Sequence, residues 1–97
     1  MSIKVIVELK AKAGQRSELK RVFESMLAEH EPNLRGFLGS ARYEVLDDPD
    51  MLVEIADWES VSARDAHMKE AAATNAYAPL VDMLAAPFRV TVLQPLH

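Results

Sequence analysis

The chain has 97 residues, of which 49% are hydrophobic and 27% charged, and its formal net charge is −4. This profile is typical of a folded protein, so we expect residues 1–97 to form a single domain with a modest core. The negative charge, without a basic stripe, argues against a nucleic-acid partner. The absence of cysteine excludes disulfides, thiolate nucleophiles and thiolate metal sites. No apolar run approaches the ~20 residues that a membrane span needs, and we expect a cytoplasmic protein with no membrane partner.

A change of period predicts the first strand and the first helix. Apolar and polar residues alternate over residues 3–10, as they do in a strand. Gly14 interrupts this pattern, and from Arg16 onward apolar residues recur at helical spacing until Pro32 and Gly36 end the helix. One stripe of this helix consists of Leu19, Val22, Phe23, Met26, Leu27 and His30.

Two further strands follow, joined by a turn. Residues 37–46 alternate, with Phe37 and Tyr43 predicted on one face, and the acidic, proline-containing stretch 47–50 predicts a hairpin turn. Residues 51–58 form a strand whose two faces are both largely apolar. Such a strand should be covered on both sides.

The last third of the chain predicts two helices and a strand. Ser60 or Ser62 begins a helix with an alanine-rich inner face, and a short helix follows before Pro87. Alternation over residues 88–92 predicts a fourth strand. The inner face of the longer helix is assigned to Ala63, Ala66, His67 and Ala71.

This order of elements predicts an α+β fold, a ferredoxin-like βαββαβ sandwich with an antiparallel sheet and helices on one face. The second apolar face of the strand at residues 51–58 then has no cover within one chain. A second copy packed sheet to sheet would supply that cover. We therefore expect a homodimer in the form of a dimeric α+β barrel.

Candidate chemistry is most concentrated over residues 57–67, D-W-E-S-V-S-A-R-D-A-H. This segment holds the only tryptophan, Trp58, at a strand end, and His67 nine residues later on the alanine face of the next helix. The two side chains can face one cavity and hold a planar substrate beside a proton acceptor. Two plainer roles stay open: Trp58 as a core aromatic, and His67 as a structural histidine bonded to a backbone carbonyl.

Glu54 is a second candidate for proton transfer. It lies four residues before Trp58 on a strand, so the two share a face about 13 Å apart and could bracket a ligand of two or three rings. The alternative for Glu54 is a carboxylate that reaches solvent or an ion pair. For His30, a favourable position at the C-terminal end of a helix is the better explanation.

No resident metal or cofactor is expected. The three histidines show neither H-x-H nor H-x-x-x-H spacing, which argues against a dedicated zinc site. None of the glycines belongs to a phosphate-binding loop, which argues against a nucleotide or flavin fold.

Four motifs along the chain carry a family resemblance. They are A-x-x-G-Q at residues 11–15, W-E-S-x-x-A-x-x-x-H at 58–67, Ala76-Tyr77, and R-V-T-V-L-Q-P at 89–95. Together they resemble the antibiotic biosynthesis monooxygenase (ABM) domain family, closest to its small quinol monooxygenase branch. The resemblance implies a dimeric α+β barrel with a pocket between sheet and helices in each subunit. Some members oxidise polycyclic or quinol substrates with O₂ and without metal or flavin; related members degrade haem, and others isomerise or degrade a signalling sugar derivative.

Some residues of this chain match the positions that the family resemblance assigns to function, and others differ. Trp58 and His67 match family positions. The polyketide-oxidising branch has an asparagine four residues before this tryptophan, where this chain has Glu54, so that hydrogen-bond donor is lost. The haem-degrading branch has an asparagine on the first strand, where this chain has Val7 and Glu8, which disfavours haem degradation.

The function that the resemblance implies is a cofactor-independent monooxygenase that oxidises a small hydroxylated aromatic or quinol with O₂. We expect His67 to be the base, with Glu54 as its rival, and Trp58 to orient the ring and shield the intermediate from water. Substrate-binding walls are expected from Tyr77, Phe23 and Phe37. The alternative is a non-oxygenase protein of the same fold that binds, isomerises or degrades a small molecule.

Overall fold

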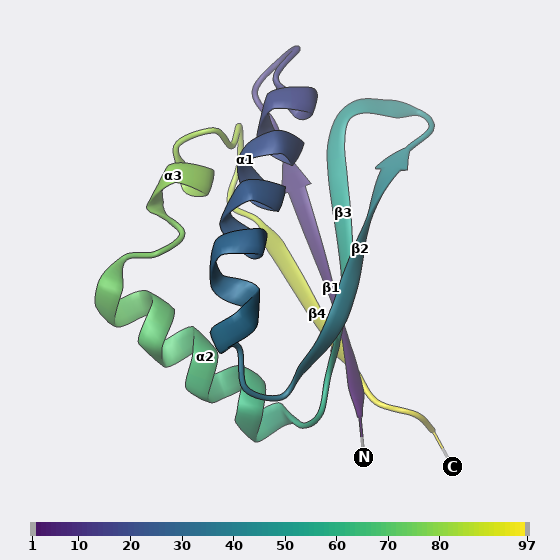
Figure 1. Ribbon diagram of the computed structural model, residues 1–97. Coiled ribbons are helices and arrows are strands. Elements are labelled where there is room, and N and C mark those ends of the chain that lie inside the picture. The colour runs from purple at the N-terminus through teal and green to yellow at the C-terminus, as the bar shows by residue number, and fades with distance from the viewer. Residues whose placement is uncertain (1, 97) are drawn as a thin grey trace.

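The structure, a computed structural model, describes residues 2–96 (Figure 1). Its elements are β1 (Ile3–Lys10), α1 (Arg16–His30), η1 (Glu31–Asn33), β2 (Phe37–Val45), β3 (Asp48–Trp58), α2 (Val61–Thr74), α3 (Ala78–Val81) and β4 (Arg89–Leu93). The strands of the described residues form an antiparallel sheet in the order β2-β3-β1-β4, and α1 and α2 lie on one face of it. This is the predicted ferredoxin-like βαββαβ sandwich, with η1 and α3 as short additions. None of the helices in residues 2–96 is long and apolar enough to cross a membrane.

Strand β3 begins earlier than the sequence pattern predicts. It starts at Asp48, and the turn before it shrinks to residues 46–47. The Asp48 carboxylate accepts hydrogen bonds from Lys10 Nζ at 2.6 and 2.8 Å, and from the Asp50 N–H at 3.1 Å. Charge-assisted partners therefore hold residues that usually favour turns in a strand conformation.

Phe37 lies on the opposite face of β2 from the one predicted. Phe37 pairs with Trp58, and Gly39 pairs with Asp57, which leaves one extra residue in β2. Such a bulge breaks the strict alternation of a strand. The prediction that Phe37 shares a face with Tyr43 was wrong for this reason, and Phe37 instead packs on Trp58 on the helix side of the sheet.

The core forms two clusters between sheet and helices, and Val7 of β1 packs against both. The first cluster packs under α1 and α3 and contains Leu9, Ala11, Leu19, Phe23, Leu52 and Leu80. The second cluster lies toward α2 and contains Ile3, Val5, Ala56 and Trp58. The two clusters mark two ends of the helix-covered face, and the functional candidates lie between them: Trp58 and Phe37 belong to or pack against the second cluster, Phe23 and Tyr77 the first.

The other face of the sheet carries apolar side chains that no helix of residues 2–96 covers (Figure 1). Along β3, buried residues on the helix side alternate with half-buried Met51, Val53 and Ile55 on this open face. Ile6 of β1 pairs with Ile55 and extends the apolar surface sideways. The predicted second apolar face of β3 is present.

Candidate functional site

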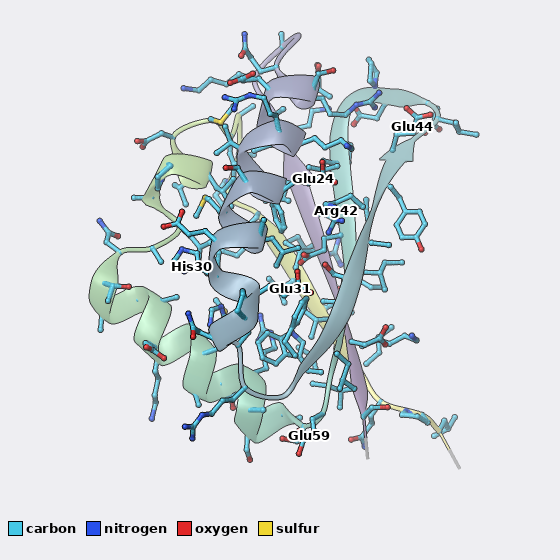
Figure 2. All side chains as sticks on the ribbon, viewed as in Figure 1. Glu24, His30, Glu31, Arg42, Glu44 and Glu59 are labelled. Carbon is cyan, nitrogen blue, oxygen red and sulfur yellow. The ribbon has the colours of Figure 1, made fainter. Side chains whose placement is uncertain are left out.

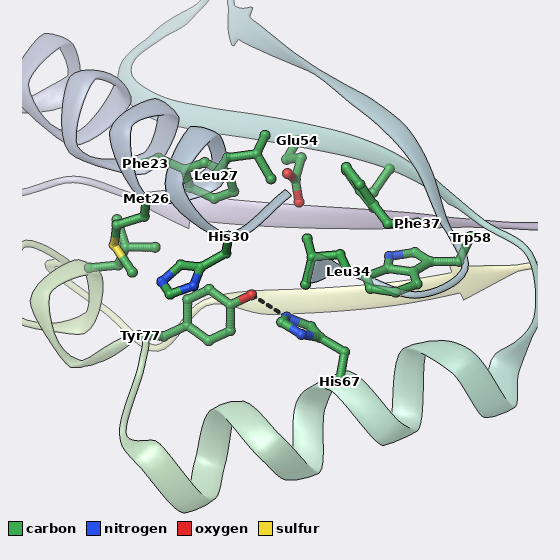
Figure 3. A pocket seen from close by; sticks show the side chains of 12 residues that line it. Phe23, Met26, Leu27, His30, Leu34, Phe37, Glu54, Trp58, His67 and Tyr77 are labelled. Atoms are coloured by element: carbon green, nitrogen blue, oxygen red, sulfur yellow. Dashed lines mark hydrogen bonds between the residues drawn. The ribbon is translucent and has the colours of Figure 1, made fainter. Parts of the chain in front are cut away.

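A cavity lies between the sheet and the helices (Figure 3). It consists of two adjoining hollows of about 60 and 90 Å³. The first hollow is lined by every residue predicted for the site: Phe23, Phe37, Glu54, Trp58, His67 and Tyr77. All of these except Phe37 also line the second hollow, which extends toward β1 and β4. Residues from α1, β2, β3, α2 and the segment before α3 therefore meet in one place, although their roles stay predictions.

Helix α2 carries His67 toward the sheet because its first turn is firmly placed. The Ser60 hydroxyl accepts the N–H of Ala63 at 3.1 Å, so Ser60 is the N-cap of the helix. Ala63 in turn lies so close to Gly36 that a Cβ there would come within 2.6 Å of the Ala63 Cβ, and the φ of +81° at Gly36 also favours glycine. Ala66, predicted on the inner face, is exposed, because it is about 100° round the helix from His67.

Trp58 and His67 stack on each other, as expected for side chains that share one cavity. Their ring centroids are 5.5 Å apart with an interplanar angle of 28°. Phe37 packs edge-on against the far side of this pair, with its centroid 5.2 Å from that of Trp58. Trp58 is also a core aromatic, since it is 5% exposed and belongs to the second core cluster. The two roles proposed for Trp58 are compatible.

His67 is hydrogen-bonded to the side chain of Tyr77. Its Nε2 lies 2.6 Å from the hydroxyl oxygen of Tyr77 (Figure 3). Burial lowers the pKa of the His67 imidazole, against the opposing charge of Glu70. Burial and the nearby Glu54 carboxyl raise the pKa of the Tyr77 phenol. A neutral imidazole therefore faces a protonated phenol near neutral pH, and the hydroxyl can donate to Nε2.

Glu54 points into the cavity from β3 (Figure 3). It is 8% exposed, and none of the ion pairs within residues 2–96 includes it. Burial raises the pKa of this carboxyl more than the Ser40 hydroxyl and the charges of Arg42 and Arg64 lower it. Glu54 is therefore neither a solvated nor an ion-paired carboxylate but a buried carboxyl group that lines the cavity.

Arg42, the cation nearest in register to Glu54, is committed to other partners. The two residues pair across β2 and β3. The Arg42 guanidinium instead donates to Glu24 of α1 and to Ser40, each at 2.9 Å (Figure 2). This arrangement leaves the Glu54 carboxyl available to a ligand.

Sequence reasoning missed His30 and Arg64. His30 is largely exposed but lines the first hollow together with Tyr77 (Figure 3), and its place at the end of the apolar stripe of α1 was the available signal. Arg64 precedes His67 by three residues and therefore lies on the same side of α2. It lines the second hollow, and its charge acts on both Glu54 and Tyr77.

Metal ligands are sparse around this cavity. Within residues 2–96 no group of three or more histidine, aspartate and glutamate side chains could hold a metal ion. His97, the third histidine, lies outside the described residues.

Comparison with solved structures shows the same fold in several proteins. The Rv0793 protein of Mycobacterium tuberculosis is 27% identical, with a TM-score of 0.79 over 100% of this chain and 97% of that chain. SnoaB, a cofactor-independent oxygenase from Streptomyces nogalater, is 14% identical, with a TM-score of 0.81 over 99% and 94% of the two chains. A monooxygenase from the gene ActVA-Orf6 of Streptomyces coelicolor, in complex with nanaomycin D, is 17% identical, with a TM-score of 0.82 over 99% and 88%. At such identities the two Streptomyces proteins show the fold alone.

Comparison at the level of sequence identifies the family. No curated protein matches the chain. The family model for antibiotic biosynthesis monooxygenase, ABM, matches residues 2–79, which is most of the chain. This protein therefore belongs to the antibiotic biosynthesis monooxygenase family.

Proposed function

We propose that the protein is a cofactor-independent monooxygenase that oxidises a small hydroxylated aromatic or quinol with O₂. The observation that carries the proposal is a neutral imidazole, His67, stacked on Trp58 in a cavity that Glu54 and Tyr77 also face. Such a site can hold a planar ring and accept its proton. Family membership supports the activity. The names of two proteins of the same fold, a cofactor-independent oxygenase and a monooxygenase, agree with it.

His67 is the general base of the proposed reaction. Its imidazole takes the phenolic proton, and the resulting phenolate gives one electron to O₂ to form a phenoxyl radical and superoxide. These recombine at a ring carbon, and the proton returns from His67 to the new peroxide. The O–O bond then breaks as water leaves with the ring hydrogen, which gives the quinone. One phenol and one O₂ thus yield one quinone and one water.

The other site residues position the ring and keep water out. Trp58 orients the ring, while Phe23, Phe37 and Tyr77 form the walls and shield the radical pair. Glu54 is the rival base, because its burial raises the pKa of the carboxyl toward the range useful for proton exchange near neutral pH.

A second candidate function is a non-oxygenase protein of this fold that binds, isomerises or degrades a small molecule. Glu54 favours this candidate, because it replaces the amide donor that the polyketide-oxidising branch carries at this position. A buried carboxyl beside an imidazole suits proton shuffling on a bound carbonyl compound as well as phenol oxidation.

Oxygen uptake with a panel of dihydroxy-aromatics tests the choice. An oxygenase should consume one O₂ for each quinone formed, with the rate unchanged by a metal chelator and no flavin absorbance in the purified protein. Binding of the same compounds without O₂ uptake would contradict the oxygenase and favour the second candidate.

We further propose that the protein is a homodimer built sheet to sheet. The support is the open face of the sheet, where Val53, Ile55 and Ile6 form an apolar surface that needs cover. Replacing Ile55 with Asp should shift the protein from dimer to monomer in sedimentation velocity and cost several kcal/mol of unfolding free energy. The same change at Val61, an exposed apolar residue on α2, is the control. A wild-type monomer at micromolar concentration would refute the dimer.

A further inference from the structure

The base proposed for the reaction already holds a phenol. The Tyr77 hydroxyl lies 2.6 Å from Nε2 of His67, and the two rings meet edge to face with centroids 5.9 Å apart. The Tyr77 hydroxyl is therefore hydrogen-bonded to the nitrogen of His67 that would accept the proton of a phenolic ligand. Its side chain carries the same functional group as the proposed class of substrate.

The volume of the cavity shows that this arrangement has to change when a ring binds. An apolar cavity of about 150 Å³ holds one benzene molecule. The two hollows measure about 60 and 90 Å³. His67 and Tyr77 line both of them, as do Phe23, Glu54 and Trp58, so the hydrogen-bonded pair forms part of the wall that the two hollows share. Moving one member of the pair joins the hollows into a space that takes a ring.

Tyr77 is the member that can move at lower cost. His67 is held in the middle of α2 and stacks on the buried Trp58. Tyr77 lies outside regular helix, between the left-handed Asn75 at the end of α2 and the four-residue helix α3. A swing of Tyr77 breaks the hydrogen bond and the contact of its ring with the first core cluster, whereas a move of His67 would disturb the stack on the buried Trp58 and the helix that carries it.

We propose that the phenolic hydroxyl of the ligand replaces the Tyr77 hydroxyl on Nε2 of His67, so that Tyr77 acts as an internal competitor that every ring must displace and that only a phenol can replace as a hydrogen-bond donor. The inference rests on the proposed function and deepens it, because it defines which ring substituent the site demands. The exchange swaps one hydrogen bond for another. Burial raises the pKa of Tyr77, so phenols that are better hydrogen-bond donors than this tyrosine displace its hydroxyl from His67. A ring without a hydroxyl leaves Nε2 of His67 without a hydrogen-bond donor and therefore binds more weakly.

Binding of two matched probes tests the competition without any turnover. 4-Nitrophenol carries the hydroxyl and is not oxidised by O₂; 4-nitroanisole has the same ring with the hydroxyl methylated. Their dissociation constants are measured for the wild type and for Tyr77→Phe, at a pH where nitrophenol is neutral. Tyr43→Phe, at the only other tyrosine, on the open face, is the control. Tyr77→Phe should bind nitrophenol about tenfold more tightly, because one hydrogen bond no longer has to be displaced. 4-Nitroanisole has to displace the same hydroxyl and should also bind about tenfold more tightly, so that it stays weaker than nitrophenol by a similar factor in both proteins, and Tyr43→Phe should match the wild type.

Weaker or unchanged nitrophenol binding by folded Tyr77→Phe would overturn the proposal and make Tyr77 a wall or a proton relay. No nitrophenol binding by any variant would overturn it as well. If Tyr77→Phe unfolds, the nitrogen resonances of His67 in the wild type decide the question. The His67 imidazole nitrogen resonances provide a second readout in the wild type: Nε2 should keep the resonance of a hydrogen-bonded nitrogen with nitrophenol and move to that of a nitrogen without a donor with nitroanisole. Because no probe is oxidised, these results are independent of oxygen uptake, and either the monooxygenase or the competition can fail alone.

Discussion

The two ends of the helix-covered sheet are built on the same two central strands but packed in opposite ways. At the closed end, under the first turns of α1, bulky apolar side chains fill the core and Leu19 is completely buried, whereas the later turns of α1 line the first hollow with Met26 and His30. Toward α2, the helix offers the small Ala63 to the sheet, and His67 fills part of the space beside it. Since β1 and β3 run through both ends, the difference comes from the helices. The volume of the side chains that a helix presents to the sheet determines whether the core there is closely packed or contains a cavity.

The end of the helix-covered face toward α2, the open end, accommodates polar side chains because each either has a hydrogen-bond partner or has a pKa that favours its uncharged form. His67 and Tyr77 satisfy each other. Glu54 has a raised pKa through burial, which favours its uncharged form. Within residues 2–96 no buried side-chain nitrogen or oxygen lacks a hydrogen-bond partner. The polar side chains of this end are therefore accommodated in the fold without a buried group that lacks a hydrogen-bond partner.

The largest expected effect is on activity, at the open end. His67→Ala should lower kcat by roughly 10²–10⁴ if His67 is the base, and it should also cost about 1–3 kcal/mol of unfolding free energy, because Tyr77 loses its hydrogen-bond partner and Trp58 its stacking partner. Steady-state oxygen uptake measures the first quantity and calorimetry the second. A much smaller loss, with Glu54→Gln causing the large one, would transfer the role to Glu54. Loss in neither variant would leave both residues as packing and favour the binding protein.

A core substitution at the closed end, under the first turns of α1, should lower stability and leave ligand binding unchanged. Leu19→Ala removes a fully buried side chain and should cost about 2–5 kcal/mol of unfolding free energy in urea titration. The remaining folded protein should keep its affinity for nitrophenol. Leu38, which is 60% exposed, provides the control, and Leu38→Ala should stay within about 0.5 kcal/mol. Loss of binding in folded Leu19→Ala would mean that the two ends are not separable.

The difference between the two ends was only partly predictable from the sequence. The period of the apolar residues sufficed for the strands and α1, and the alanines beside His67 indicated spare room. The stack of His67 on Trp58 follows from a strand end leading straight into a helix. These features depend on contacts close in sequence, which the pattern of residues records.

The features that the sequence did not reveal depend on contacts distant in sequence. The bulge that turns Phe37 toward Trp58 depends on pairing with β3. The bond between His67 and Tyr77 depends on where the chain goes after α2 turns at Asn75. His30 reaches the cavity only because α1 ends above it, so its helical position alone had suggested a plainer role.

A smaller effect, at the open end, should appear as a dependence of stability on pH. Burial raises the pKa of Glu54 in the folded state, so the folded protein holds this proton more tightly than the unfolded chain does. Stability is then highest below the ordinary pKa of glutamate and falls as pH rises through the raised value. Glu54→Gln removes this loss, so its stability relative to wild type should rise as the pH increases from below the ordinary pKa of glutamate through the raised pKa of Glu54. Glu29→Gln, on the exposed side of α1, should show no such trend in paired thermal melts. A flat difference for Glu54→Gln would mean that the carboxyl titrates normally.

The smallest effect concerns how firmly α2 presents His67. Ser60→Ala removes the side chain that accepts the Ala63 N–H and should cost about 1 kcal/mol. Ser62→Ala is the matched control, because Ser62 is the other serine that the sequence allowed as a cap, and it should change stability by less than about 0.5 kcal/mol. The loss at Ser60 should be local, because the cap fixes the turn where Ala63 meets Gly36, one turn before His67. Amide exchange in the first turn of α2 should therefore accelerate in Ser60→Ala while exchange in α1 does not. Equal acceleration in both helices would mean that the open end unfolds together with the closed one, and that the alanine-faced helix has no local stability of its own.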